Sequence, residues 1–388
     1  MRDRSLIKTP NWYQAHFANI VAEPSNINEA LKSTHAKEWI EAMEDEMDSH
    51  AKNKTWTLVE HKSDMKVLGN RWVFKVKRKA DKSIDKFKAR LVAKGFKQQA
   101  GLEYDETFAS VCRYESIRLL LALAAVQNLH IVQFDVKTAF LYGEIDKEIY
   151  MDQPEGFEVK GERKLVCKLN KSLYGLKQSP RCWNQKFNEV LSQMNMTPIM
   201  SDSCVYKGVI QEQLVVFALY VDDGLIMSAS EGAMNELINL LKTEFEIKVS
   251  QAIVFVGLQI FTTNNGGIFL SQESYVDELL QKFGLENCNP VSVPIQPNTD
   301  LQVKPSADTI TVPYRQLVGS LLFIARLTRP DVAFAVSKLA QFANNVSELH
   351  WSATKKVLRY LAGTKNYGLH YQPYGNEDLY GYCCVCCK

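Results

Sequence analysis

The chain has 388 residues, of which 46% are hydrophobic and 23% are charged, and its formal net charge is +2. A chain of this length and composition folds into two or three globular domains with a sizeable core. No apolar run approaches the roughly 18 residues of a membrane span, and the first residues lack the apolar core of a signal peptide. These features exclude a membrane-spanning or secreted chain, and we expect an intracellular protein.

Apolar periodicity predicts mixed helices and strands up to a Pro-rich linker at 287–313, and helices alone after it. Residues 1–30 are expected to be loosely ordered. The expected elements are, in chain order, a helix at 35–53, strands at 71–79 and 87–96, a helix at 115–128, a strand at 129–136, a helix at 180–194, strands at 213–221 and 224–228, and helices at 230–245, 314–327, 330–345 and 350–363. The order strand, helix, hairpin, helix, strand is that of a split βαβ layer, a sheet backed by helices on one side.

Three helix boundaries follow from local chemistry. Pro180 suits a first helical turn, because the N–H that proline lacks would have no partner there. Ser230 can cap the next helix with its hydroxyl, and Gly363 is expected to stop the last one.

The segment 71–97 holds eleven Lys or Arg residues against two Asp, a net charge of +9. Four aromatic residues are interleaved with these cations: Trp72, Phe74, Phe87 and Phe96. A solvated face of a β-ribbon is the simpler explanation. Such a density of cations among aromatic rings is what a surface for nucleic acid or polyphosphate requires, and we favour that interpretation.

The stretch "FALYVDDGLIMS" (217–228) places two aspartates between two apolar runs. Asp223 and Gly224 predict a tight hairpin turn, because both residue types tolerate positive φ. Asp222 adds a second carboxylate, and adjacent carboxylates repel each other unless a cation neutralises them. Oxygen ligands suit a hard divalent ion such as Mg²⁺. The hairpin alone is compatible with a turn or a metal site, and Asp135, near the end of a buried strand, is the candidate third carboxylate.

Nine cysteines are present, and five of them lie singly, as expected of reduced thiols. The other four crowd into the final "CCVCCK". A zinc site there is not expected, because Cys383 and Cys386 have no second C-x-x-C or His pair to complete four ligands.

Several motifs together resemble reverse transcriptases of copia-type (Ty1/copia) LTR retrotransposons. The palm of that family is similar to "FDVKTAFLYG", "KLNKSLYGLKQSPRCW" and "LYVDDGLIM", and its fingers are similar to "RWVFKVKRKADKSIDKFKARLVAKGFKQ". The region after its palm is similar to "YRQLVGSLLFIARLTRPDVAFAVSKLAQF" and "HWSATKKVLRYLAGT". The resemblance implies an α+β right-hand polymerase. Its parts would be a loose segment 1–30, fingers 31–110, a ferredoxin-like palm 111–260, thumb and connection helices 261–372, and a tail 373–388.

The resemblance also implies the site. Asp135, Asp222 and Asp223 would be catalytic and would hold two Mg²⁺ ions, or Mn²⁺, together with the backbone carbonyl of Val136; Asp223 would be the less direct ligand. Phe140 would be an aromatic gate that collides with a ribose 2′-hydroxyl, although a core aromatic is the simpler role. The further residues implied are Tyr174, Gly175, Lys177, Lys88 and Arg90 for nucleotide binding and Phe255, Val256 and Gly257 for the primer grip. Lys248 would protonate pyrophosphate, although a solvated surface lysine is an equally simple role.

The function implied is an RNA-directed DNA polymerase acting on deoxynucleoside triphosphates with an RNA or DNA template and primer. The alternative is a catalytically inactive nucleic-acid-binding relic; a phosphohydrolase lacks a water-activating His. Protease, integrase and RNase H parts of the polyprotein would be partners, no membrane would be involved, and the location would be a cytoplasmic virus-like particle or the nucleus. Cys384 stands where the first RNase H aspartate is expected, so we expect a truncated or frame-shifted tail.

Overall fold

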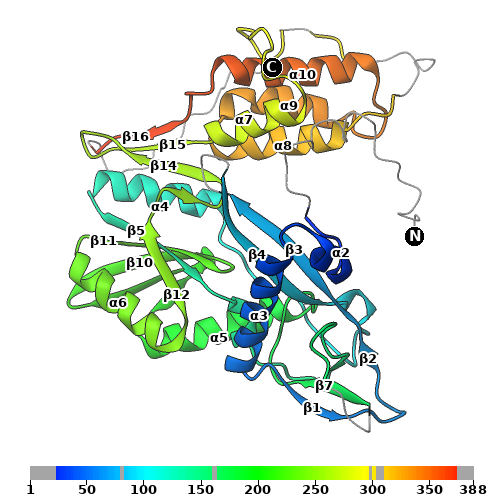
Figure 1. Ribbon diagram of the computed structural model, residues 1–388. Coiled ribbons are helices and arrows are strands. Elements are labelled where there is room, and N and C mark those ends of the chain that lie inside the picture. The colour runs from blue at the N-terminus through cyan, green and yellow to red at the C-terminus, as the bar shows by residue number, and fades with distance from the viewer. Residues whose placement is uncertain (1–22, 79–82, 160–163, 297–298, 303–309, 374–388) are drawn as a thin grey trace. The chain divides into compact units, whose positions relative to one another are not determined.

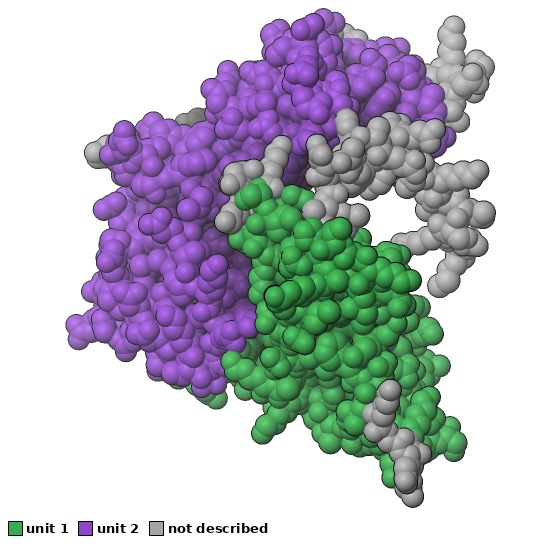
Figure 2. Space-filling view, viewed as in Figure 1, with its two compact units in different colours: residues 1–110, 138–193 green, residues 111–137, 194–388 purple. Residues whose placement is uncertain are grey.

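The computed structural model describes residues 23–78, 83–159, 164–296, 299–302 and 310–373. The chain divides into two compact units: unit 1 comprises residues 1–110 and 138–193, and unit 2 comprises residues 111–137 and 194–388 (Figure 2). The fold mixes helices and sheets, as the sequence predicts (Figure 1). No helix within the described ranges is both long and apolar enough to cross a membrane.

Unit 1 is organised around a long hairpin and the helix that packs on it. Strand β3 (Asn70–Arg78) pairs antiparallel with β4 (Ile84–Ala93), and helix α3 (Ala36–Lys52) packs against β4. Trp39 of α3 is fully buried and meets the Phe74 ring edge-on, with the ring centroids 5.1 Å apart. Because an edge-on aromatic pair stabilises beyond the area it buries, this contact helps to fix α3 on the hairpin.

The rest of unit 1 is a small sheet, in the order β1-β7-β6-β2, and four short or medium helices. The two-residue strands of this sheet are too short to show a period of two, so the sequence did not predict it. These elements are β1 (Trp56–Glu60), β2 (Val67–Leu68), β6 (Tyr150–Met151), β7 (Leu165–Leu169), α2 (Ile27–Lys32), η2 (Gly95–Lys97), η3 (Ala139–Tyr142) and α5 (Ser179–Gln193).

Unit 2 contains a six-stranded sheet in the order β12-β5-β11-β10-β9-β8. Helix α6 (Glu231–Glu244) follows β11, and the Ser230 hydroxyl caps it by accepting from the backbone N of Ala233 at 3.3 Å, as predicted. The strands are β5 (His130–Val136), β8 (Thr197–Ile199), β9 (Asp202–Ile210), β10 (Gln213–Tyr220), β11 (Asp223–Ser228) and β12 (Ile247–Gln251).

A second sheet of unit 2, β13-β14-β15-β16, leads into a group of helices with their own core (Figure 1). Three of these helices were predicted from apolar periodicity, whereas α7 was not. The elements are α4 (Tyr114–Val126), β13 (Val254–Phe255), β14 (Leu258–Thr262), β15 (Ile268–Ser271), α7 (Glu273–Lys282), α8 (Tyr314–Leu327), η4 (Pro330–Val332), α9 (Ala333–Ala340), α10 (Glu348–Gly363) and β16 (Leu369–Tyr371).

The turn predicted at Asp223 and Gly224 is wrong. The hairpin at 217–228 turns at Val221 and Asp222, because Tyr220 pairs with Asp223, so Asp223 and Gly224 lie inside β11. Helix α10 (Glu348–Gly363) ends at Gly363, as predicted. A Cβ on Gly363 would lie 2.8 Å from Cβ of Pro290, so this glycine serves a close approach between segments.

The five cysteines within the described ranges are free, as predicted, and four of them are buried. Burial raises the pKa of the Cys182 thiol to about 11, so this thiol stays protonated at neutral pH. The predictions for the C-terminal cysteines fall on residues outside the described ranges.

Candidate functional site

Three charged side chains stand in one row across neighbouring strands of unit 2. Asp135 of β5 lies directly opposite Asp223 of β11 on one side and directly opposite Lys248 of β12 on the other. Residues directly opposite each other in an antiparallel pair project from the same face of the sheet. Two carboxylates and one ammonium group are therefore presented together, near the end of β5.

Asp222 reaches the same end of the sheet through its backbone. Its carbonyl oxygen accepts a hydrogen bond of 2.8 Å from the backbone N of Val136, which is fully buried. The structure thus brings Asp135 together with Asp222 and Asp223, which lie far from it in the sequence.

The turn that presents Asp222 is strained. Val221, the first of its two central residues, has φ = +59°, which a β-branched side chain rarely adopts. Gly or Asn normally stands where a two-residue hairpin turn needs positive φ. Such a conformation costs on the order of 1–3 kcal/mol and clusters at functional sites in proteins. The strained backbone at Val221, beside the predicted catalytic residue Asp222, is therefore consistent with a functional role for the tip of this hairpin.

The donor set at this end of the sheet suits a hard divalent cation. Asp135, Asp222 and Asp223 offer only oxygen atoms, the ligands that Mg²⁺ prefers. Within the described ranges, however, no group of three or more His, Cys, Asp or Glu side chains is arranged so as to hold a metal ion. The backbone pairing gathers the aspartates, and their side chains do not form a ready-made ion cage.

In unit 1, three of the residues predicted to bind nucleotide form one stack. The guanidinium carbon of Arg90 lies over the Tyr174 ring, 4.9 Å from its centroid, and the Phe140 ring meets Tyr174 edge-on at 5.0 Å. The Nε atom of Arg90 is buried without a hydrogen-bond partner in the described ranges. Because a buried donor without a partner is costly, this atom is the one feature of the stack that calls for a further acceptor.

The backbone of Gly175 lies close against strand β4. Its φ is +95°, and a Cβ there would lie 2.2 Å from the carbonyl oxygen of Ala93. The backbone N of Ala93 also donates to the Tyr174 carbonyl at 2.8 Å. Any residue other than glycine would push the 174–175 loop off the hairpin. A role for Gly175 toward a nucleotide stays a prediction.

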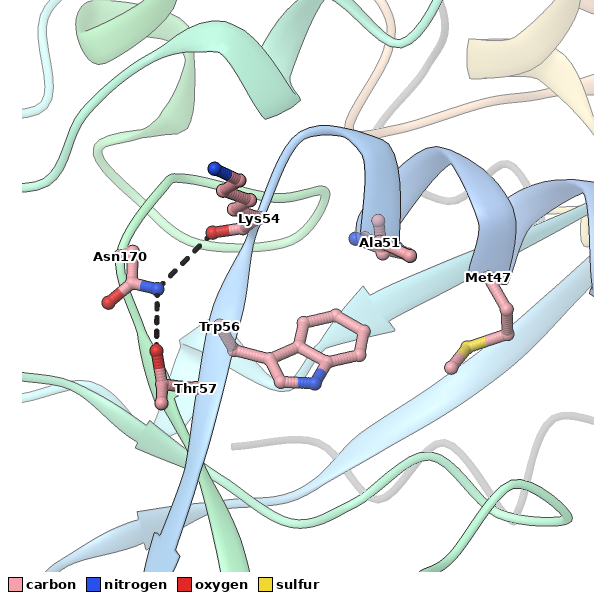
Figure 3. A pocket seen from close by; sticks show the side chains of 7 residues that line it. Met47, Ala51, Lys54, Trp56, Thr57 and Asn170 are labelled. Atoms are coloured by element: carbon pink, nitrogen blue, oxygen red, sulfur yellow. Dashed lines mark hydrogen bonds between the residues drawn. The ribbon is translucent and has the colours of Figure 1, made fainter.

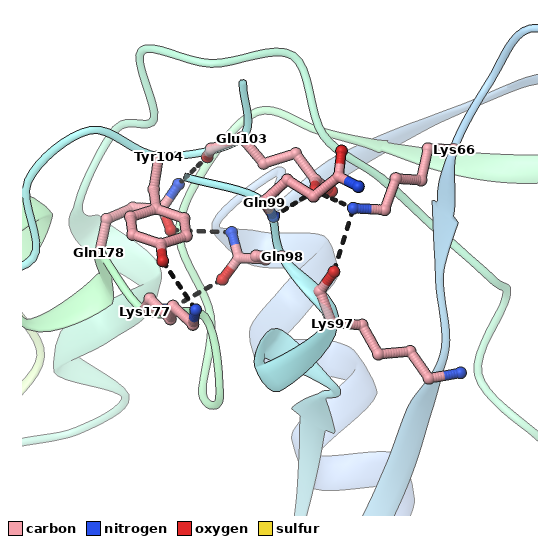
Figure 4. Close-up of polar contacts among 8 residues, drawn as sticks. All are labelled: Lys66, Lys97, Gln98, Gln99, Glu103, Tyr104, Lys177 and Gln178. Atoms are coloured by element: carbon pink, nitrogen blue, oxygen red, sulfur yellow. Dashed lines mark hydrogen bonds and ion pairs between the residues drawn. The ribbon is translucent and has the colours of Figure 1, made fainter. Parts of the chain in front are cut away.

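Lys177 is anchored within unit 1 (Figure 4). Its ammonium group donates to the Tyr104 hydroxyl at 2.7 Å and lies 4.4 Å from the centroid of that ring. Its backbone N donates to the side-chain carbonyl of Gln98 at 2.8 Å, and Gln98 in turn donates to Gln178 at 3.0 Å. The lysine predicted to contact nucleotide is therefore held in place by a mostly buried polar network.

The β3–β4 register gathers cations on one face of the hairpin. Alternate residues of β3 are buried, and the intervening residues are exposed. Two cations of this face have carboxylate partners: Lys75 pairs with Glu23 at 3.0 Å, and Lys86 pairs with Asp45 at 3.1 Å. The Lys and Arg residues that the register places together on this basic face are Arg71, Lys75, Lys77, Lys86, Lys88 and Arg90.

The predicted primer-grip segment forms a two-residue hairpin in unit 2. Val254 pairs with Gln259, and Phe255 pairs with Leu258, so Val256 and Gly257 are the turn residues. Both have positive φ, +48° and +79°, as a turn of type I′ requires. The role of this hairpin as a primer grip stays a prediction.

Comparisons with known proteins identify the family of the chain. A sequence model of the family described as reverse transcriptase (RNA-dependent DNA polymerase) matches residues 53–297, more than half of the chain. The chain belongs to this family. It is 41% identical over 352 residues to the retrovirus-related Pol polyprotein from transposon TNT 1-94 of Nicotiana tabacum, which covers 88% of this chain and 26% of that protein.

Two further relatives place the chain among copia-type reverse transcriptase regions. The Pol polyprotein from transposon RE1 of Arabidopsis thaliana is 36% identical, over 93% of this chain and 24% of that protein. The putative transposon Ty5-1 protein of Saccharomyces cerevisiae is 31% identical, over 64% of this chain and 82% of that protein. This reverse transcriptase chain spans about a quarter of the length of the two Pol polyproteins.

The sequence did not point to the residues that anchor Lys177 in this reverse transcriptase. Gln98 and Gln178 are 5% and 3% exposed, and glutamine is rarely buried unless it is hydrogen-bonded. Only their spatial contact identifies them, since 80 residues separate them in the chain. Tyr104 gave no signal because a single tyrosine in a polar segment matches no pattern.

Proposed function

We propose that the chain is an RNA-directed DNA polymerase module of a copia-type Pol polyprotein, extending a primer on an RNA or DNA template with deoxynucleoside triphosphates. One observation carries the proposal: Asp135 lies opposite Asp223, with Asp222 in the adjoining turn. Facing carboxylates repel each other, and a protein that handles anionic phosphate gains from them only if they serve a cation.

The chemistry proposed for this site is two-metal nucleotidyl transfer. Asp135, Asp222 and the Val136 carbonyl would hold two Mg²⁺ ions, or Mn²⁺, with Asp223 as the less direct ligand. When bound, such ions would lower the pKa of the primer 3′-hydroxyl and would neutralise charge on the leaving pyrophosphate. Lys248, in the same row, would donate a proton to the pyrophosphate oxygen, since an ammonium group is a positioned acid there.

The stack of Arg90, Tyr174 and Phe140 would select the incoming nucleotide. The Arg90 guanidinium would bind phosphate oxygens in bidentate fashion, which would also satisfy its buried Nε donor. Phe140 would exclude a ribose 2′-hydroxyl by collision. Lys88 is proposed as the second cation for the triphosphate, while Lys177 and Gly175 would shape the loop that carries Tyr174.

The resemblance to copia-type reverse transcriptases also supports the proposed assignment of the remaining domains. The basic face of β3–β4 supports a fingers role at 31–110, because phosphate neutralisation dominates nucleic-acid affinity. The strand order β12-β5-β11-β10 supports a ferredoxin-like palm at 111–260, and the helices α7 to α10 support a thumb and connection at 261–372. Phe255, Val256 and Gly257 would hold the primer end.

The polymerase is proposed to work with the protease, integrase and RNase H parts of a Pol polyprotein, in a cytoplasmic virus-like particle or in the nucleus. The names of the relatives as Pol polyproteins support this assignment of partners.

Primer extension by the purified chain tests the proposal. With an end-labelled DNA primer on an RNA template, Mg²⁺ and deoxynucleoside triphosphates, we expect products longer than the primer. The alternative, a nucleic-acid-binding relic, predicts that the same template-primer binds but is never extended. Absence of extension with either Mg²⁺ or Mn²⁺, under conditions where binding is saturated, would favour the relic.

A further inference from the structure

A pocket of about 450 Å³ opens in unit 1 between the end of α3 and the start of β1 (Figure 3). No residue predicted or proposed above to act in catalysis or nucleotide binding lines it. Its volume is within the range of roughly 300–1,000 Å³ that small-molecule sites occupy. The lining residues are Met47, His50, Ala51, Lys54, Trp56, Thr57 and Asn170.

The pocket offers a surface for a flat ring. The Trp56 indole is half-buried and tilts against the His50 ring at a centroid distance of 4.7 Å. Figure 3 shows the indole between Met47 on one side and Thr57 with Asn170 on the other. An indole face beside a polarizable thioether is a good stacking surface for an aromatic heterocycle.

One hydrogen-bonding atom of the pocket is left available. The side-chain amide of Asn170 donates to the Lys54 carbonyl at 3.2 Å and to the Thr57 hydroxyl at 3.0 Å, which uses both its hydrogens. Its Oδ1 atom remains as an acceptor. His50 is 2% exposed, and its Nε2 atom has no hydrogen-bond partner in the described ranges.

The His50 ring is held inside unit 1 by its neighbours. The Thr55 hydroxyl lies 3.2 Å from both the His50 carbonyl oxygen and the His50 Nδ1 atom. The His50 Nε2 atom is buried and faces Glu46. Oε1 of Glu46, 3.6 Å from this Nε2, is itself an acceptor and already receives the backbone N of Leu91 at 3.0 Å.

Lys54 adds a cation at the rim of the pocket. It is exposed, makes no ion pair with a described residue, and has φ = +52°, a left-handed conformation that favours Gly or Asn. The Asn170 amide holds this backbone in place through the Lys54 carbonyl. A lysine in a conformation that disfavours it suggests a use for its side chain.

We propose that this pocket binds a single nucleotide, with the base stacked on Trp56 and the phosphate at the Lys54 ammonium group. The exocyclic amine of adenine or cytosine donates to Oδ1 of Asn170, and uracil and thymine have no such amine. The site is additional to the proposed polymerase chemistry and does not depend on it.

Isothermal titration of the full chain with 5′-AMP and 5′-UMP, in EDTA at low salt, tests the proposal. EDTA removes divalent ions, so the aspartates of unit 2 repel the phosphate instead of recruiting it. We expect a 5′-AMP Kd on the order of 0.1–1 mM, because an open site gives a small ligand modest affinity. UMP should bind several-fold more weakly. Trp56→Leu should weaken 5′-AMP binding about tenfold or more, as loss of one stacked base typically does.

Lys54→Asn is the matched variant for the phosphate contact, because Asn suits the left-handed backbone and should keep the Tm unchanged or higher. It should weaken 5′-AMP binding and flatten its dependence on salt. Lys171→Gln, a nearby lysine that does not line the pocket, should leave binding unchanged. Equal 5′-AMP affinity in wild type, Trp56→Leu and Lys54→Asn would overturn the proposal. So would the absence of binding at millimolar 5′-AMP, or tighter binding of N-acetyltryptophanamide, which would make the pocket a peptide site.

Discussion

Gly224 of β11 lies directly across from Phe134 of β5, and the Phe134 ring fills the space that a side chain at Gly224 would need. A Cβ on Gly224 would be 2.1 Å from the ring carbon Cζ of Phe134, which is completely buried. The two residues adjoin Asp223 and Asp135 on the same pair of strands. Packing of the ring on the glycine therefore fixes the register that places the two carboxylates opposite each other.

Gly224→Ala should destabilise the protein by about 2–4 kcal/mol, because the buried ring cannot move aside without displacing the core. Urea unfolding followed by circular dichroism measures this. Gly319→Ala is the control: Gly319 is exposed in α8, and a Cβ there would meet no atom outside its own helix within 4 Å. That change should stabilise by about 0.5–1 kcal/mol through helix propensity. Equal effects of the two substitutions would contradict the packing account.

Much of this region could be predicted from the sequence, but the turn could not. Asp-Gly is the strongest local turn signal, and it predicted a turn at Asp223 and Gly224. The structure places the turn two residues earlier, with Val221 strained, because Gly224 is needed beneath Phe134. That requirement comes from a strand remote in the sequence, and local patterns do not contain it.

The same limit applies to the three residues of unit 1 that are proposed to select the incoming nucleotide. Arg90, Tyr174 and Phe140 were each suggested by resemblance, and only the structure shows that the three side chains stack on one another. The alternation at 71–79 and 87–96 did predict two strands, because successive residues of a strand point to opposite faces.

Phe140→Val should admit ribonucleotides, because the smaller side chain removes the collision with the 2′-hydroxyl. We expect the preference for deoxynucleotides over ribonucleotides to fall at least tenfold, about 1.4 kcal/mol. Primer extension with each nucleotide class, read as the ratio of the two kcat/KM values, measures it. If the ratio stays at the wild-type value while stability drops, Phe140 serves only to pack Tyr174.

Lys248→Gln should lower the rate of nucleotide addition about 100-fold if the ammonium group protonates pyrophosphate. Affinity for template-primer should change little, because one exposed cation is lost. Lys242→Gln, an exposed lysine in the last turn of α6, is the control and should keep the wild-type rate. A Lys248→Gln enzyme as fast as the control would leave Lys248 as a surface lysine opposite Asp135.

Asp202 should make stability depend on pH. Burial raises the pKa of its carboxyl, but hydrogen bonds from the Ser116 hydroxyl and from the backbone N of Arg113 and Cys204 prevail and lower it overall. A lowered pKa means that the carboxylate stabilises the fold above its unfolded pKa of about 3.9 and that this contribution is lost as the pH falls through the folded value.

Asp202→Asn should therefore cost about 1–2 kcal/mol at pH 7 and less at pH 3, because the charged acceptor of these bonds is lost. Thermal unfolding of both proteins at pH 7, 5 and 3 measures the difference. A constant difference at all three pH values would mean that the charge of Asp202 is not what stabilises the start of α4.

Single-turnover primer extension by Asp135→Asn tests the central claim most directly, with the affinity for the same template-primer measured in parallel. The substitution keeps size and shape but removes the charge that faces Asp223 and Lys248. The account predicts that extension falls to the limit of detection, while template-primer binds as tightly as to wild type or slightly more tightly, since a negative charge near phosphate is gone. Extension at the wild-type rate by Asp135→Asn would contradict the account, and the row of Asp135, Asp223 and Lys248 would then not be the catalytic site.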